Sequence, residues 1–352
     1  GVYLNDFMRL MGWNANTNLT FGSFHIDIAP IIIVAFFTTL LVFGTKIGAR
    51  VDGAMTVLKI AIVFFVVIVG FFYVKASNFT PFIPPSQPAS TVEGSSAVTG
   101  VMTQPLWQFA TGMTPSVYGV PGILSGAALV FFAFIGFDVV ATASEETKNP
   151  HKNVPLGIGV GMLLIIVMYM LVAVVTTGMV SYADLAKQDS PSLATAFELV
   201  GADWAAKIIS FGIVLGLATV VMVLLLGLTR IVFAMSRDGL LPRGLSKTGK
   251  HGTPAALQIV VGAVVALVAA FFDIGVLSDM VNIGTLSAFT LVAISIPIMR
   301  KKRPDLPRAF KMPGSPWIPI LIAVANFWLM LNLSVLTWIR FVVWLVGGFA
   351  IY

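Results

Sequence analysis

The chain has 352 residues and a mean hydropathy of +0.96; 58% of the residues are hydrophobic and only 10% are charged. Soluble globular domains carry roughly 25% charged residues, so the composition excludes a soluble protein and predicts an all-α, multi-pass membrane protein. The absence of cysteine excludes disulfides and thiolate metal sites, and three histidines leave little for any other metal site. The formal charge of +6 does not indicate nucleic-acid binding, because the basic residues gather at the ends of hydrophobic runs.

Nine hydrophobic runs are long enough to cross a bilayer as helices, for which about 20 residues are needed. In chain order they fall at about 29–45, 53–74, 121–143, 154–180, 205–235, 254–273, 280–299, 316–336 and 337–352. Residues 75–120 predict a long, proline-rich loop with one short surface helix near Trp107. We expect residues 1–352 to form a single transmembrane domain that is truncated at its N-terminus, because the chain begins without Met at GVYLNDFMRLMG.

The basic residues are distributed unevenly between the two sides of the cell membrane. Fifteen of the 21 lysines and arginines fall in or beside four loops, and cytoplasmic loops are the ones that carry such an excess of positive charge. The loops expected in the cytoplasm are 46–52, 144–153, 236–253 and 300–315. The long loop 75–120 is then external, and Asp273 and Asp279 flank another external turn.

The run 121–143 carries a glycine and an acid at membrane depth. Gly136 interrupts the helical pattern, and Asp138 follows before a charged loop. A carboxylate inside a membrane is costly and usually functional, and secondary transporters use half-helices broken at mid-membrane to expose backbone groups to a substrate. The alternative is structural: the glycine allows close helix packing and the acid bonds to a neighbouring helix. The residues alone leave both interpretations open.

One lysine, Lys59, lies inside the run 53–74, about six residues and roughly 9 Å past the cytoplasmic turn at 1.5 Å per residue. At that depth a lysine side chain can extend to the headgroups. The functional alternative is a lysine that faces the helix bundle. There it loads and releases a proton, or acts as a fixed cation in the place where another carrier holds sodium.

Two further runs carry small or polar residues. The face of run 205–235 that contains Gly212, Gly216 and Thr219 allows close packing or places a hydroxyl near a site. The start of run 280–299 carries gate residues or interhelical hydrogen-bonding groups: Asn282, Thr285 and Ser287. The sequence shows no phosphate loop, metal-ligand cluster or serine–histidine pair that indicates an enzyme, so we expect neither catalysis nor a cofactor.

Four segments are specific enough to indicate a family. They are FFAFIGFDVVATASEETKNPHKNVPLGI, GTKIGARVDGAMTVLKIAIV, LGLTRIVFAMSRDGLLP and RKKRPDLPRAFKMPGSPWIP. The first resembles the sixth helix and following loop of the amino acid–polyamine–organocation transporters, with the cationic amino acid transporter branch and its bacterial members most similar. The others resemble the join of that family's fourth and fifth helices, the end of its eighth, and the run between its tenth and eleventh. The resemblance implies an inverted five-helix repeat, in which the nine runs are the fourth to twelfth of twelve helices and the first three are missing.

The resemblance also implies a site. Five residues would form the helix break that binds substrate: Phe132, Ala133, Phe134, Ile135 and Gly136. Main-chain carbonyls there would receive the substrate's ammonium, since the carbonyl end of a broken helix favours a cation, and Phe132 would lie over the substrate as a lid. Asp138 would hold the unwound segment to a neighbouring helix. Lys59 matches the fifth-helix lysine of proton-coupled members, and Thr219 falls where the eighth helix comes near the same slot.

The resemblance therefore implies proton-coupled symport of small neutral and/or cationic L-amino acids by alternating access, with protons and membrane lipids as the other partners and no metal. Besides Asp138, no acid in these runs is placed to meet a substrate's side-chain cation. A cationic substrate would therefore need an acid from the missing helices. The alternatives are a cationic amino acid exchanger, working as antiporter or facilitator, and a non-transporting membrane scaffold, which would need neither the break nor the lysine. The oligomeric state is not determined by the sequence.

Overall fold

The computed structural model describes residues 2–13, 17–21, 24–43, 45–91, 100–137, 140, 147–188, 191–247, 254–272, 274–306, 308 and 312–351. Most of them are helical. The described strands form two short antiparallel two-stranded sheets: the hairpin of β1 (Asn18–Phe21) with β2 (Phe24–Asp27), and the pair of β3 (Gln87–Pro88) with β4 (Ser116–Val117). In the first hairpin the ends of the strands pair Asn18 with Asp27. The predicted all-α class is confirmed.

A helix lies along each of the nine hydrophobic runs. These helices are α2 (Ile28–Phe43), α3 (Thr45–Phe71), α5 (Gly119–Val130) with the 3-10 turn η4 (Phe131–Phe134), α7 (Pro150–Met179), α10 (Asp203–Arg237), α11 (Ala255–Phe271), α12 (Ile274–Lys302), α13 (Trp317–Leu331) and α14 (Val335–Ile351). Within the described residues, four are long and apolar enough to cross a membrane: Gly53–Phe71 of α3, α7, α10 and α12. The 35 residues of α10 measure about 52 Å, more than the roughly 30 Å hydrocarbon core of a bilayer.

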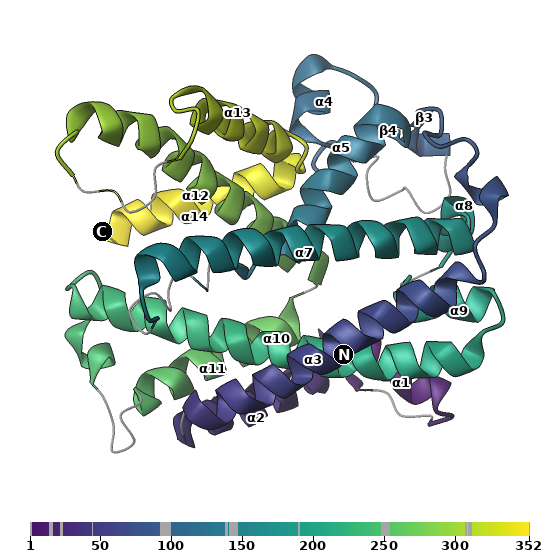
Figure 1. Ribbon diagram of the computed structural model, residues 1–352, viewed down its shortest axis with the longest axis horizontal. Coiled ribbons are helices and arrows are strands. Elements are labelled where there is room, and N and C mark those ends of the chain that lie inside the picture. Colours follow the sequence, from purple (N-terminus) through teal and green to yellow (C-terminus); the bar gives the residue numbers. More distant parts are fainter. Residues whose placement is uncertain are drawn as a thin grey trace. The chain divides into compact units, whose positions relative to one another are not determined.

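The chain forms two compact units, and α10 is the central helix of the first, which contains Gly1–Thr80 and Val160–Phe272. α10 packs against α1 (Val2–Leu10), α2, α3, α9 (Leu193–Leu199) and α11 (Figure 1). Burial of apolar side chains stabilises these contacts. The buried side chains form two clusters, one around Val66, Val175, Phe197 and Ile209 and the other around Val34, Phe37, Leu41, Leu225 and Leu257.

The second unit contains Pro81–Asp138 and Asp273–Tyr352, and α12 is its central helix. α12 packs against α5, α13 and α14, and the short helix α4 (Leu106–Thr111) packs against α14. Backbone hydrogen bonds attach this part of the long loop to the turn between α13 and α14. The N–H of Leu106 donates to the carbonyl of Leu333 over 3.0 Å. The helix expected near Trp107 is therefore present, and it is docked on the C-terminal helices.

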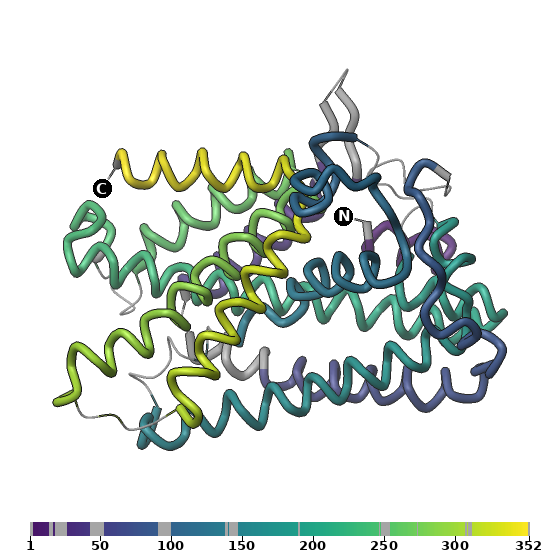
Figure 2. The backbone as a smooth tube through the Cα atoms, turned by 90° about the horizontal axis from the view of Figure 1, so that it is seen from above, coloured from purple at the N-terminus to yellow at the C-terminus, as the bar shows by residue number. Residues whose placement is uncertain are grey.

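Several helix ends differ from the predicted ones. α3 begins at Thr45, and α7 begins at Pro150 and runs unbroken for 30 residues (Figure 2). α12 begins at Ile274, so Asp279 lies inside a helix rather than beside a turn. Each of the four loops predicted in the cytoplasm includes described helical residues: 46–52, 144–153, 236–253 and 300–315. Hydropathy marks where a helix leaves lipid, but lysine and arginine are good helix formers that let the helix continue. The side of the membrane that each segment faces stays a prediction.

Candidate functional site

The third hydrophobic run contains a helix break. α5 ends at Val130 and passes into η4, after which Ile135 is extended, with φ −65° and ψ 137°. Gly136 follows with φ +120°, a backbone conformation that residues with a side chain rarely adopt. The N–H of Ile135 donates to the carbonyl of Phe132 over 3.2 Å and closes the turn. The regular helix therefore stops where the resemblance places the break.

The five predicted substrate-binding residues make up this break. Phe132 is 41% exposed and Ala133 is also exposed, whereas Phe134, Ile135 and Gly136 are half-buried. The carbonyl end of an interrupted helix carries partial negative charge, and each carbonyl has two lone pairs. A carbonyl that already accepts one hydrogen bond can therefore accept another from an ammonium group. Asp138, predicted to hold this segment, lies outside the described residues.

Lys59 is half-buried on α3, and its side chain lies against α10. A methyl group added at Gly216 would lie 3.7 Å from Lys59 Cγ and 4.0 Å from Cδ, which is ordinary van der Waals contact. Thr219, about one turn further along α10, is 3% exposed and donates its hydroxyl to the Gly216 carbonyl over 2.9 Å. The structure thus brings Lys59 and Thr219 to the same glycine, within the first unit.

The polar residues near the start of α12 have different partners. Asn282 is completely buried, and its Nδ2 donates to the carbonyl of Leu129, in the last turn of α5, over 3.4 Å. Ser287 donates instead to a carbonyl of its own helix over 2.7 Å. Asp279 accepts a hydrogen bond from the Thr337 hydroxyl of α14 over 3.1 Å. Of the two interpretations of Asn282, the structure shows the interhelical hydrogen bond.

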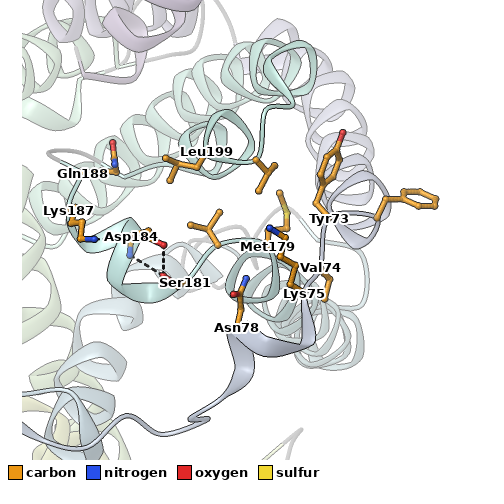
Figure 3. A pocket seen from close by; sticks show the side chains of 13 residues that line it. Tyr73, Val74, Lys75, Asn78, Met179, Ser181, Asp184, Lys187, Gln188 and Leu199 are labelled. Atoms are coloured by element: carbon orange, nitrogen blue, oxygen red, sulfur yellow. Dashed lines mark hydrogen bonds and ion pairs between the residues drawn. The ribbon is translucent and has the colours of Figure 1, made fainter.

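A cavity of about 670 Å³ lies in the first unit, at the ends of α3 and α7. The short helix α8 (Tyr182–Ala186) and the end of α9 complete its wall (Figure 3). Lys187 Nζ lies 3.3 Å from Asp184 Oδ1, and the Ser181 hydroxyl donates to Asp184 Oδ2 over 2.7 Å. Hydrogen bonds from Ser181 and Lys187, together with the lysine's charge, lower the pKa of the Asp184 carboxyl below its usual value.

No predicted site residue lines this cavity, and sequence reasoning missed it. A local signal exists in the spacing of Ser181 and Asp184, because a serine three residues before an acid is typical of a helix start. The walls, however, come from segments far apart in the sequence. Among the described residues, no group of three or more His, Asp or Glu side chains is placed to hold a metal ion.

Comparison with known proteins identifies relatives over nearly the whole chain. A profile of the family described as amino acid permease matches residues 3–351. The branched-chain amino acid permease BcaP of Bacillus subtilis (strain 168) is 39% identical over 99% of this chain and 70% of its own length. The methylthioribose transporter of the same organism is 37% identical over 91% of this chain and 62% of its own length. The vacuolar cationic amino acid transporter 4 of Arabidopsis thaliana is 34% identical over 80% of this chain and 42% of its own length.

The chain thus spans between 42% and 70% of the length of these relatives. All three carry the names of permeases or transporters rather than of enzymes. The family match over residues 3–351 agrees with the apolar helices and with the break in the third hydrophobic run. The resemblance drawn from the four sequence segments is confirmed, and the chain belongs to the amino acid permease family, within the amino acid–polyamine–organocation superfamily.

Proposed function

We propose that the protein is a secondary active amino acid transporter that couples uptake to protons and works by alternating access. The observation that carries the proposal is the helix break ending at Gly136, in a chain of the permease family. Interrupted membrane helices present their dipole ends and main-chain groups to substrates. Carbonyls of the break would bind the substrate's ammonium, and the exposed ring of Phe132 would close over it.

Small or branched neutral L-amino acids are the substrates that we propose. The segment 131–137 reads FFAFIGF, so its side chains are apolar and include no acid to pair with a side-chain cation. A relative named for branched-chain amino acids is 39% identical, whereas one named for cationic amino acids is 34% identical. A cationic substrate would need an acid outside this segment, such as Asp138.

Lys59 is the group that we propose for proton coupling. Its stem lies against Gly216 of α10, which supports a lysine facing the helix bundle rather than one directed only to the headgroups. Gain or loss of a proton would change its contacts with α10 and so bias the balance between inward and outward states. Coupling requires only that substrate and proton favour the same state.

The test is uptake of labelled leucine and arginine into proteoliposomes that carry the full-length protein, with and without an inward proton gradient. We expect leucine to accumulate only with the gradient, and excess arginine to compete weakly. Uptake that ignores the gradient but needs internal amino acid would overturn proton coupling and indicate an exchanger. Accumulation of arginine would overturn the neutral substrate class. A protein that neither transports nor is stabilised by any amino acid would be a non-transporting membrane scaffold.

A further inference from the structure

One side chain of α12 contacts the broken helix on both sides of the break. The ring of Phe289 lies 6.1 Å from that of Phe131, edge to face at 77°, and 5.4 Å from that of Phe137, tilted by 42°. Phe131 precedes the extended residue Ile135, and Phe137 follows Gly136. Phe289 therefore bridges the break from the neighbouring helix.

A second α12 side chain, Asn282, lies about two turns earlier and reaches the last turn of α5. Its Nδ2 donates to the Leu129 carbonyl over 3.4 Å, at the long end of hydrogen-bond distances. The side chain is 0% exposed, and its Oδ1 has no hydrogen-bond partner among the described residues. A buried acceptor without a partner is costly, so this amide needs an explanation.

Packing alone does not explain the amide. Ile283 and Leu286 of α12 are completely buried in one cluster with Ala128 of α5, so the surroundings of Asn282 are apolar. An apolar side chain of the same shape in such a place is often neutral or stabilising, because it leaves no polar atom unpaired. The amide instead supplies a donor to the Leu129 carbonyl, two residues before the 3-10 turn η4 begins at Phe131.

We propose that Asn282 and Phe289 are positioning residues that hold the helix break in the geometry its binding site needs. Asn282 Nδ2 holds the last turn of α5, and Oδ1 accepts a main-chain N–H of segment 131–137 when that segment changes conformation. Phe289 keeps Phe131 and Phe137, which lie on either side of the break, in fixed positions. The role of Asn282 and Phe289 in substrate binding rests on the proposed function. Their stabilisation of the helix break does not.

The first test compares Asn282→Leu with a matched control, Ser278→Ala, in the full-length protein. Ser278 is 8% exposed, lies one turn earlier on α12, and donates its hydroxyl to the Gly275 carbonyl of its own helix over 2.9 Å. Hydrogen–deuterium exchange of segment 131–137 is measured without substrate, and KM and the maximal rate are measured for leucine uptake.

In Asn282→Leu we expect exchange of segment 131–137 to be about fivefold faster, the change that loss of one net hydrogen bond produces. We expect KM to rise more than the maximal rate falls, at an unchanged melting temperature. A purely structural role would leave KM unchanged or lower the melting temperature. Ser278→Ala should match the wild type in all of these measurements.

A second pair of variants keeps the question decidable if Asn282→Leu fails to fold. Phe289→Leu removes the ring that bridges Phe131 and Phe137, and it should speed exchange of the same segment. Phe289→Tyr keeps the ring and its contacts, so this variant should retain the slow exchange and the KM of the wild type.

Wild-type exchange in both Asn282→Leu and Phe289→Leu would overturn the proposal. Faster exchange with an unchanged KM would also overturn it, because α12 would then support the helix without setting the geometry of the site. A wild-type protein that neither binds nor transports leucine would refute the proposed function. The exchange rates would still decide whether α12 holds the break.

Discussion

Among single residues, Gly136 tests the break most directly. Its φ is +120°, and a Cβ there would meet no atom within 4 Å, so Gly136→Ala introduces backbone strain without a clash. Such strain costs about 1–3 kcal/mol, so we expect a lower melting temperature and a higher KM for leucine. Gly126→Ala, in α5, also meets open space but at an ordinary φ, and helix propensity should make it neutral or stabilising by up to about 1 kcal/mol. Equal melting temperatures for the two variants would contradict the assigned backbone.

Substitution of a second single residue, Lys59, tests proton coupling. Lys59→Ala removes the ammonium group of a side chain whose stem lies against Gly216, so we expect residual leucine uptake to become independent of external pH. Uptake by the full-length protein is measured across a series of external pH values at fixed internal pH. The control is Lys207→Ala, which removes an exposed lysine of α10 and should keep the wild-type pH profile. A wild-type pH profile in Lys59→Ala would refute the coupling role.

Between elements, the approach of α3 to α10 depends on Gly212. A Cβ at that position would overlap with Ile62, so Gly212→Ala should separate the helices and cost about 1–3 kcal/mol. Adding Ile62→Ala should recover part of that loss, which makes the two effects non-additive. Gly216→Ala meets only the ordinary 3.7 Å contact with Lys59 and should melt close to the wild type. The measurement is thermal unfolding in detergent, and equal losses for both glycine variants would contradict this packing.

The helices also show how much of the fold can be predicted from the sequence. The existence of the nine helices is predictable because each apolar run must satisfy its backbone internally in lipid. The ends of these helices are less predictable. α3 already includes Lys46 and Arg50, and α12 already includes Asp279, all of which precede the corresponding hydrophobic runs. The break was foreseen from Gly136 and the family resemblance. The contact of Asn282 with Leu129 was not, because it joins residues 153 positions apart and leaves no trace in hydropathy.

For the whole molecule, the positions of the basic residues constrain the orientation. α10 ends at Arg237, and the last turn of α12 contains Arg300, Lys301 and Lys302. Positive charge at the C-terminal end of a helix interacts favourably with the helix dipole. The same side chains can also extend to the lipid headgroups. Among the residues described between α10 and α12 there is one apolar helix, α11. If each of the three crosses the membrane once, the basic ends of α10 and α12 lie on the same side, and the excess of positive charge predicts that this side is the cytoplasm.

This orientation is testable because the 352 residues contain no cysteine, so that single cysteines can report on it. Ser77→Cys lies in the 3-10 helix Ala76–Phe79 of the long loop, and Arg243→Cys in the 3-10 helix Arg243–Ser246 after α10; both positions are exposed. Any cysteine elsewhere in the full-length protein is first replaced by serine. A membrane-impermeant maleimide should label Ser77→Cys in intact cells and Arg243→Cys only after permeabilisation. The reverse pattern would contradict this orientation. The face that carries the long loop would then be cytoplasmic, and the face after α10 would be exposed to external protons and substrate.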